Sequence, residues 1–287
     1  RIIRRAVKEE IALYTMHTNY DIAPGGLNDV LAEKLKLTAT EVLSKTSAQE
    51  LKKLVVFGPE GSLEAIRSAL GESGAGWIGN YSHCTFCQSG QGTFKPRAGT
   101  NPHTGKVGQL NEVDESRLET IVPAEKLAGV IEEMLAVHPY EEPAYDIYPL
   151  ANQGEINGLG RLGRIPTTEL AEYITTIKTE LELEKVEAVG DLSSSITKVA
   201  VCGGSGADLI EPAAAKGADL LVTGDIKFHQ AQEAEKQGLA VVDAGHYGTE
   251  KIMAEAVANY LRQNIEAEQL EAKVAKSQID TNPWQVI

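Results

Sequence analysis

The sequence contains few of the features that mark secreted or membrane-spanning proteins. Only 3 of its 287 residues are cysteine, an odd number that fits a reducing compartment better than a disulfide framework. No apolar run approaches the length of a transmembrane helix, and no signal peptide is visible. We therefore expect a cytoplasmic protein that does not contact a membrane.

Positive charge and aromatic side chains are also scarce. The chain carries 27 Lys and Arg against 41 Asp and Glu, and this net charge of −14 argues against a general nucleic-acid-binding surface. Aromatic residues make up only 5% of the chain, and no exposed apolar stretch stands out that would locate a subunit interface. The remaining composition, 42% hydrophobic and 24% charged, is that of a globular chain long enough for about two domains.

A repeated strand–turn–helix pattern organises residues 198–250. Short apolar runs alternate there with helical stretches; the runs are residues 199–202, 220–223 and 239–242, and the helices are about 208–216, 227–237 and 249–263. This alternation predicts an α/β fold with a parallel sheet and crossover helices. Ligands of such sheets lie outside the carboxyl ends of the strands, which is where Gly, Asp and His residues collect in this chain.

His246 follows the third apolar run and lies four residues before Glu250. If a helix has begun by Tyr247, the two side chains share one face and could form half of a metal site. A helix cap followed by a solvated glutamate would give the same spacing. Asp225 and Asp243 end adjacent predicted strands and could accept hydrogen bonds from ligand histidines, although we favour a helix N-cap for Asp225.

Two further patterns give weak signals. The run GGSG at residues 203–206 could present backbone N–H groups to a phosphate, but a tight strand–helix turn needs the same glycines. Cys84 and Cys87 have CxxC spacing without a second pair, and His83 with His103 would be needed to complete a zinc site. We therefore interpret both cysteines as buried strand residues.

The first half of the chain predicts two different regions. Residues 11–16 are a strand candidate that ends in the polar cluster HTNYD at 17–21, and residues 28–37 form an amphipathic helix. Residues 38–53 are polar and irregular, which indicates a domain boundary. The order strand–helix–strand–strand–helix–strand over residues 54–150 then suggests a ferredoxin-like domain.

Three segments outside these regular elements contain glycines or aromatic residues. Residues 71–108 are interpreted as a long hairpin or loop whose aromatic side chains pack. Residues 149–163 form a Gly-rich connection, and the end of the chain is expected to dock through Trp284.

Six motifs, found in the same order, resemble the NIF-three-like family of GTP cyclohydrolase 1 type 2 homologues. They are HTNYD at 17–21, GGLND at 25–29, GWIGNYS at 76–82, HPYEEPAYD at 138–146, TGDIKFH at 223–229 and DAGHYGTE at 243–250. The third and fourth look like the extra middle domain of the long bacterial members, which is similar to the PII and CutA folds. The resemblance implies NIF-three-like sheet lobes at 1–53 and 151–287, with the inserted domain at 54–150.

The same resemblance implies a dinuclear metal site and an assembly. Members bind two divalent metal ions per subunit and form a toroidal homohexamer, and the matching ligands here are Asp21, His246 and Glu250. The family also supplies an adjacent His-His pair upstream of residues 11–16, which this sequence lacks, so we expect an incomplete N-terminal segment. Zn, Fe, Mn, Co and Ni all suit such ligands.

His17 and His229 are candidate catalytic residues. Either could hydrogen-bond a ligand carboxylate or move a proton during hydrolysis, and either could instead be a satisfied turn or helix histidine. The main hypothesis is a metal-dependent hydrolase of a small nucleotide-like substrate, with GTP suggested by the resemblance. The alternative is a non-catalytic regulatory or scaffold protein whose middle domain trimerises and binds a metabolite.

Overall fold

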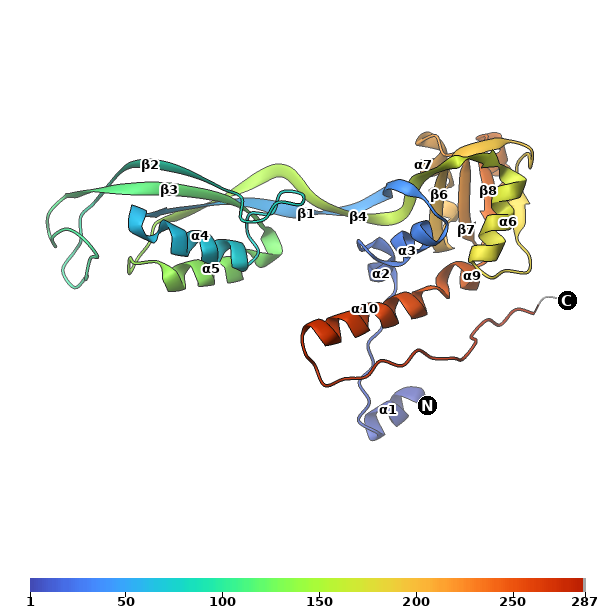
Figure 1. Cartoon of the computed structure of the whole chain (residues 1–287), viewed down its shortest axis with the longest axis horizontal. Coiled ribbons are helices and arrows are strands. Elements are labelled where there is room, and N and C mark those ends of the chain that lie inside the picture. The colour runs from blue at the N-terminus through green and yellow to red at the C-terminus, as the bar shows by residue number, and fades with distance from the viewer. Residues whose placement is uncertain (286–287) are drawn as a thin grey trace. The chain divides into compact units, whose positions relative to one another are not determined.

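Two long strands organise the chain in the computed structural model, which describes residues 1–285. β1 (Thr38–Gly58) and β4 (Tyr145–Glu169) each pass from one structural unit to the other (Figure 1). Unit 1 contains Arg1–Ser47 with Ile156–Ile287, and unit 2 contains Ala48–Glu155. In the described residues the strands pair in the order β2-β3-β1-β4-β6-β7-β8-β5. The fold is therefore α/β with a mixed sheet.

Unit 1 contains the predicted parallel strands. They are β6 (Ser195–Ser205), β7 (Leu220–Gly224) and β8 (Ala240–Asp243), and the pairs β6–β7 and β7–β8 are parallel. Two antiparallel neighbours flank them: β4 pairs with β6, and β5 (Glu187–Val189) pairs with β8. The prediction of a parallel βαβ series is confirmed.

Both faces of this sheet are buried, which explains why its strands are continuously apolar. α3 (Leu27–Lys34) and α6 (Leu170–Glu180) pack on the face to which Val199 and Val201 point. The helices α7 (Ile210–Ala215) and α8 (Phe228–Lys236) pack on the opposite face, together with Ala200 and Cys202. The sheet edge at the carboxyl ends of β6, β7 and β8 is the part of unit 1 that positions a site.

Four further α-helices lie in the described part of unit 1. They are α1 (Ile2–Lys8), α2 (Thr18–Ile22), α9 (His246–Glu250) and α10 (Met253–Ala267), with the 3₁₀ turn η3 (Ala207–Leu209) before α7. Within the part of the chain that the structure describes, none of the helices combines the length and the apolar character needed to cross a membrane.

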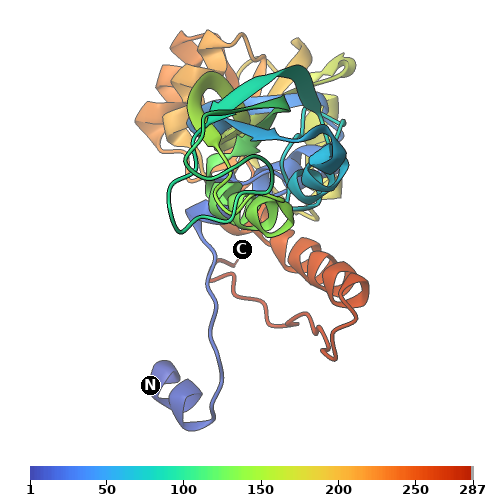
Figure 2. The ribbon, with the colours of Figure 1, turned by 90° about the vertical axis from the view of Figure 1, so that its left-hand side faces the viewer.

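Unit 2 has the predicted order of elements, β1-α4-β2-β3-α5-β4. Its other members are α4 (Leu63–Glu72), β2 (Thr85–Phe94), β3 (Asn111–Pro123) and α5 (Leu127–Val137), with the 3₁₀ turns η1 (Glu60–Ser62) and η2 (Ala124–Lys126) before the helices. The strand order β2-β3-β1-β4 is the ferredoxin-like one. Figures 1 and 2 show α4 and α5 along one face of this sheet, where Leu54, Ile66 and Met134 form a core.

Three predicted elements are wrong. Residues 11–16 are not a strand, because their apolar side chains (Leu13 is 61% exposed) meet no neighbouring strand. Residues 38–53 and 149–163 are not irregular but lie in β1 and β4. The two units nevertheless divide inside these segments, after Ser47 and after Glu155, close to the predicted boundaries after residues 53 and 150. These segments are exposed, and pairing of the two strands holds them through contacts such as the bond from Thr46 Oγ1 to the Asn157 carbonyl, 3.2 Å.

Several side chains predicted to be buried are exposed. Trp77 in the loop after α4, Phe86 on β2 and Trp284 near the end of the described chain are 54%, 64% and 83% exposed, so none of the three packs as expected. Cys87 is exposed and Cys84 is half-buried, which corrects their interpretation as buried strand cysteines. The aromatic and apolar character of these residues gave no information on which of them finds a packing partner.

Candidate metal centre

His246 and Glu250 lie side by side on α9. The helix begins at His246, directly after Gly245, which has φ +77° and turns the chain away from β8. His246 Nε2 and Glu250 Oε1 are 3.1 Å apart, as expected for side chains four positions apart on one helix face. The sequence-based prediction of a shared face is confirmed, and the pair lies at the carboxyl end of the parallel sheet.

Asp225 holds the other side of the His246 ring. Its Oδ2 atom is 2.7 Å from His246 Nδ1, and it reaches the ring from the end of β7 with φ +58°. The hydrogen bond to Asp225 is the largest cause that raises the pKa of His246; the nearby Glu250 charge adds to it, and burial opposes it. The imidazole is thus flanked by a carboxylate at each nitrogen, which favours its protonated form when no other cation is present.

Asp21 belongs to the same electrostatic cluster. It lies on α2, and burial followed by the negative charge of Glu250 raises its pKa, while His17 and His246 lower it. A carboxyl group that is hard to ionise beside a second carboxylate is the arrangement that a bound cation would relieve. Asp21, His246 and Glu250, predicted from three separate segments, therefore influence one another in the fold.

Asn28 fixes the position of the Asp21 segment. Its side chain is completely buried; Nδ2 donates to the Asp21 carbonyl at 2.9 Å, and Oδ1 accepts from the Gly203 N–H at 2.9 Å. One amide therefore connects α2 to the end of β6. Sequence analysis missed this residue, because an asparagine at the start of a helix is ordinarily a surface cap.

Gly204 provides the space for the site. Its φ is +65°, and a Cβ atom there would lie 2.6 Å from Glu250 Oε1. Its N–H donates to Thr249 Oγ1 at 2.9 Å, and the Gly203 N–H is also used by Asn28. The hypothesis that these two glycines present free N–H groups to a phosphate is therefore wrong, because both donors already have protein acceptors.

The two candidate catalytic histidines differ in position. His17 precedes α2, its Nδ1 lies 3.1 Å from Thr18 Oγ1, and its charge acts on Asp21. His229 is exposed on α8, where Nδ1 is 3.3 Å from Gln232 Oε1 and the ring packs edge-on against Phe228. In the described residues we find no interaction between His229 and the cluster around His246.

Of the two aspartates that end adjacent strands, Asp225 accepts from a histidine as one interpretation of the sequence suggested, and Asp243 does not. Asp225 is not the cap of α8, whose N-cap is Lys227, but the partner of His246. Among the described residues, Asp243 has no hydrogen bond to a histidine; its oxygens accept the N–H groups of Ile226 at 2.7 Å and Gly245 at 2.8 Å. Asp243 thus shapes both turns at the sheet edge, and Asp225 orients the imidazole.

Cys202 lies beneath the cluster. It is buried at the end of β6, and burial together with the charges of Asp21 and Glu250 raises its pKa to about 12. The thiol is therefore protonated in the metal-free protein. As the side chains stand, no group of three or more His, Cys, Asp or Glu residues among residues 1–285 is close enough to hold a metal ion.

The comparisons with known proteins agree over nearly the whole chain. A family model described as Duf34/NIF3 (NGG1p interacting factor 3) matches residues 1–283. Proteins named GTP cyclohydrolase 1 type 2 homolog are 47% identical in Bacillus subtilis and 45% identical in Halalkalibacterium halodurans. These matches cover 99% and 100% of this chain, and 76% and 77% of the relatives.

Solved structures give the same result. A Bacillus cereus protein related to NIF3 is 46% identical with a TM-score of 0.93, covering all of this chain and 76% of that protein. The Staphylococcus aureus protein SA1388 is 28% identical with a TM-score of 0.72, covering all of this chain and 75% of that one. Motifs, fold and relatives thus agree, and the chain belongs to the DUF34/NIF3 family.

Proposed function

We propose that this chain binds divalent metal ions through Asp21, His246 and Glu250, and that it is a metal-dependent hydrolase of a small nucleotide-like substrate. The observation that supports the proposal is the His246 imidazole held between two carboxylates at the carboxyl end of a parallel sheet. The names of the relatives make GTP the first substrate to test.

The chemistry of these residues fits a divalent cation. With Asp225 accepting the Nδ1 proton, a neutral His246 turns the Nε2 lone pair toward Glu250 Oε1 at 3.1 Å. Two acceptors at this distance repel each other unless a proton or a cation is shared between them. Nitrogen and carboxylate ligands suit Zn, Fe, Mn, Co or Ni. A second ion would need more ligands than these three residues, such as the His-His pair that the resemblance implies.

A bound divalent cation would supply Lewis-acid activation of a water molecule and of a substrate oxygen. The chain's own residues prepare the site in three ways. Asp225 keeps the proton on Nδ1 and leaves Nε2 free as a ligand. His17, exposed beside Asp21, is placed to carry a proton between the site and solvent, and Asn28 keeps the Asp21 segment in position. A catalytic role of His229 stays a prediction.

Metal binding is tested first. The protein is stripped with a chelator and titrated with Zn²⁺, Mn²⁺, Co²⁺ and Ni²⁺, and with Fe²⁺ without oxygen, in a calorimeter. Glu250→Gln and His246→Ala should each weaken binding by at least about tenfold, since each removes one ligand. Glu211→Gln, an exposed carboxylate on α7, is the matched control and should bind normally. Equal binding by the control and both site variants would sink the metal proposal.

Hydrolysis is tested separately. GTP turnover is followed by release of formate with each metal, and His246→Ala should abolish it. Stoichiometric metal binding without turnover of GTP or related nucleotides would reject the hydrolase and retain the metal site. That result would favour a regulatory or scaffold role. The proposed homohexamer is tested separately, by light scattering on the same samples.

A further inference from the structure

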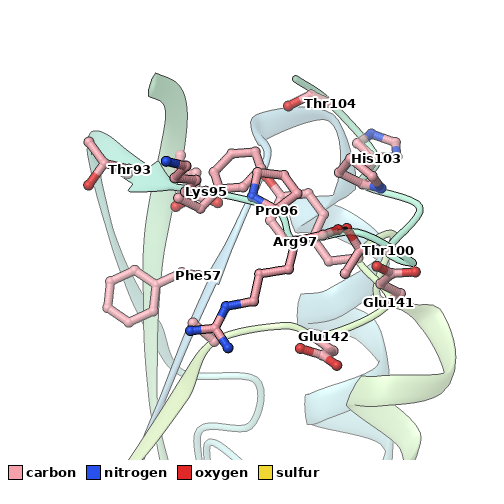
Figure 3. Close-up of a pocket in the computed structure, with 16 residues that line it drawn as sticks. Phe57, Thr93, Lys95, Pro96, Arg97, Thr100, His103, Thr104, Glu141 and Glu142 are labelled. Atoms are coloured by element: carbon pink, nitrogen blue, oxygen red, sulfur yellow. Dashed lines mark hydrogen bonds between the residues drawn. The ribbon is translucent and has the colours of Figure 1, made fainter. Parts of the chain in front are cut away.

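Unit 2 contains a cavity of about 680 Å³, which is within the size range of small-molecule sites. Its walls come from β1, the end of β2 with the loop that follows it, and the turn before β4 (Figure 3). Phe57, Phe94 and Pro96 provide an apolar surface, and Lys95 and Arg97 bring positive charge into it. No residue of the candidate metal centre belongs to this unit.

The loop that covers the cavity is held in place by contacts to its surroundings. The Asn101 N–H donates to both carboxylate oxygens of Glu141, at 3.0 and 3.2 Å. The His103 ring lies 5.7 Å from the Tyr140 ring, and the Gly108 N–H donates to the Pro96 carbonyl at 2.8 Å. The cavity is therefore formed before any ligand arrives, which reduces the entropic cost of binding.

His138 fixes the opposite wall. Its Nδ1 accepts the Tyr140 N–H at 3.1 Å, so its protonated Nε2 donates to the Phe57 carbonyl at 3.0 Å. The His138 and Tyr140 rings meet edge-on at 5.1 Å. This buried histidine connects the turn before β4 to β1.

The carboxylates and the cations in the cavity differ in how they are used. Glu141 accepts the Asn101 N–H. Burial and the negative charge of Glu115 raise the pKa of Tyr140, but the buried Tyr140 hydroxyl forms no well-aligned hydrogen bond among the described residues. The Arg97 and Lys95 side chains, by contrast, form no hydrogen bond or ion pair with any described residue. In Figure 3 the Arg97 side chain points toward the space between Phe57 and Glu142.

The unpartnered cations give the cavity strong hydrogen-bond donors. Arg97 offers a planar fork of N–H groups, and Lys95 offers an ammonium group. The Glu115 and Glu142 carboxylates in the same lining are strong acceptors that accept no hydrogen bond from any other described residue. A guanidinium fork binds carboxylate and phosphate groups most strongly, and a phenylalanine wall favours a flat apolar body.

We propose that this cavity binds a small organic anion, whose carboxylate or phosphate group contacts Arg97 and Lys95 and whose planar body packs on Phe57. The site is independent of the metal centre and works in the metal-free protein. It gives unit 2 a binding activity of its own.

The test is calorimetric titration of the whole protein in chelator with four probes. Phenyl phosphate and benzoate carry a ring and an anion, benzamide carries the ring alone, and inorganic phosphate carries the anion alone. Saturable binding of either ringed anion at millimolar concentration is expected, with weaker binding of benzamide and of inorganic phosphate. The tighter of the two ringed anions identifies the anionic group.

Variants locate the site. Arg97→Gln should raise the dissociation constant of the tighter-binding ringed anion by about tenfold or more, because one charge-assisted contact is lost. Lys106→Gln removes the same charge from an exposed residue of the same loop that does not line the cavity, and should leave binding unchanged. Melting curves confirm that both variants fold. The absence of binding by both ringed anions, benzamide binding as tightly as benzoate, or equal losses in the two variants would overturn the proposal.

Discussion

At the scale of single residues, the candidate metal centre depends on backbone conformations that few side chains allow. Gly204 approaches Glu250 closely, and Asp225 adopts a left-handed conformation in order to reach His246. An L-residue with positive φ costs roughly 1 kcal/mol or more, and such strain is often found at functional sites. Both positions lie at the carboxyl ends of the parallel strands, beside the candidate metal centre.

Gly204→Ala should destabilise the protein by about 2 kcal/mol, through backbone strain and the clash with Glu250 Oε1. Gly217→Ala is the matched control, because Gly217 has φ +69° but open space around its Cβ position. The difference in urea denaturation free energy between the two variants measures the crowding alone. If the two losses are equal, Glu250 does not occupy the space that Gly204 leaves.

The pH dependence of the metal-free protein should report on His246. Its pKa is raised above the unfolded value, so its stabilising contribution is complete below the ordinary histidine pKa, about 6.5, and is lost as pH rises through the raised value. Asp225→Asn removes the largest cause of the raised His246 pKa, so the stability contributed by His246 should be lost at a lower pH. NMR titration of the His246 ring proton measures its pKa in the original protein and in Asp225→Asn. Asp208→Asn, which changes an exposed residue, is the control and should leave the His246 pKa unchanged.

At the scale of elements, one buried amide connects helix α3 to two neighbouring segments. Both polar ends of the Asn28 side chain are satisfied, by the Asp21 carbonyl and the Gly203 N–H. The same helix carries Asp29, whose carboxylate forms a bidentate ion pair with the buried Arg161 on β4. Arg161 Nη2 lies 2.8 Å from Asp29 Oδ2. α2 and α3 are thus fixed to the sheet by polar contacts as well as by apolar packing.

Asn28→Ala should cost about 3 kcal/mol in the free energy of unfolding, because it leaves a buried carbonyl and a buried N–H without partners. It should also weaken metal binding, because the Asp21 segment is released. Asn264→Ala breaks one exposed side-chain bond, to the Tyr260 carbonyl, and should cost much less. Comparable losses in urea denaturation for the two variants would contradict this role of Asn28.

At the scale of the whole molecule, the two units have separate hydrophobic cores. Met134, Ile66 and Leu54 belong to the core of unit 2, and Leu220 belongs to that of unit 1. Only β1 and β4 continue from one unit to the other. We therefore expect each unit to unfold with its own transition, since each cluster of buried apolar residues lies within a single unit.

Calorimetry of core variants tests this expectation. Met134→Ala should remove about 2–5 kcal/mol from the stability of unit 2, and Leu220→Ala a similar amount from that of unit 1. Each substitution should lower the melting temperature of one transition and leave the other in place. A single transition that both substitutions shift together would indicate one cooperative unit.

The sequence by itself determined the parallel series of β6, β7 and β8, the ferredoxin-like order of unit 2 and the shared face of His246 and Glu250. These features follow from local periodicity, because strands buried on both faces are continuously apolar and helix neighbours are four residues apart. Asp21 was added to the candidate ligands only by resemblance to the family motifs. It lies 225 positions before His246 (246 − 21), so local residue spacing could not connect the two.

Only the tertiary structure decided which polar residues meet. Asp225 pairs with His246, Asn28 connects Asp21 to Gly203, and the lining of the unit 2 cavity combines residues from positions 57 to 144. The exposed parts of β1 and β4 form strands because they pair with each other, without an apolar pattern that would reveal them. Contacts of this kind form between segments that are far apart in the sequence, and neither composition nor local periodicity shows which distant segments come together.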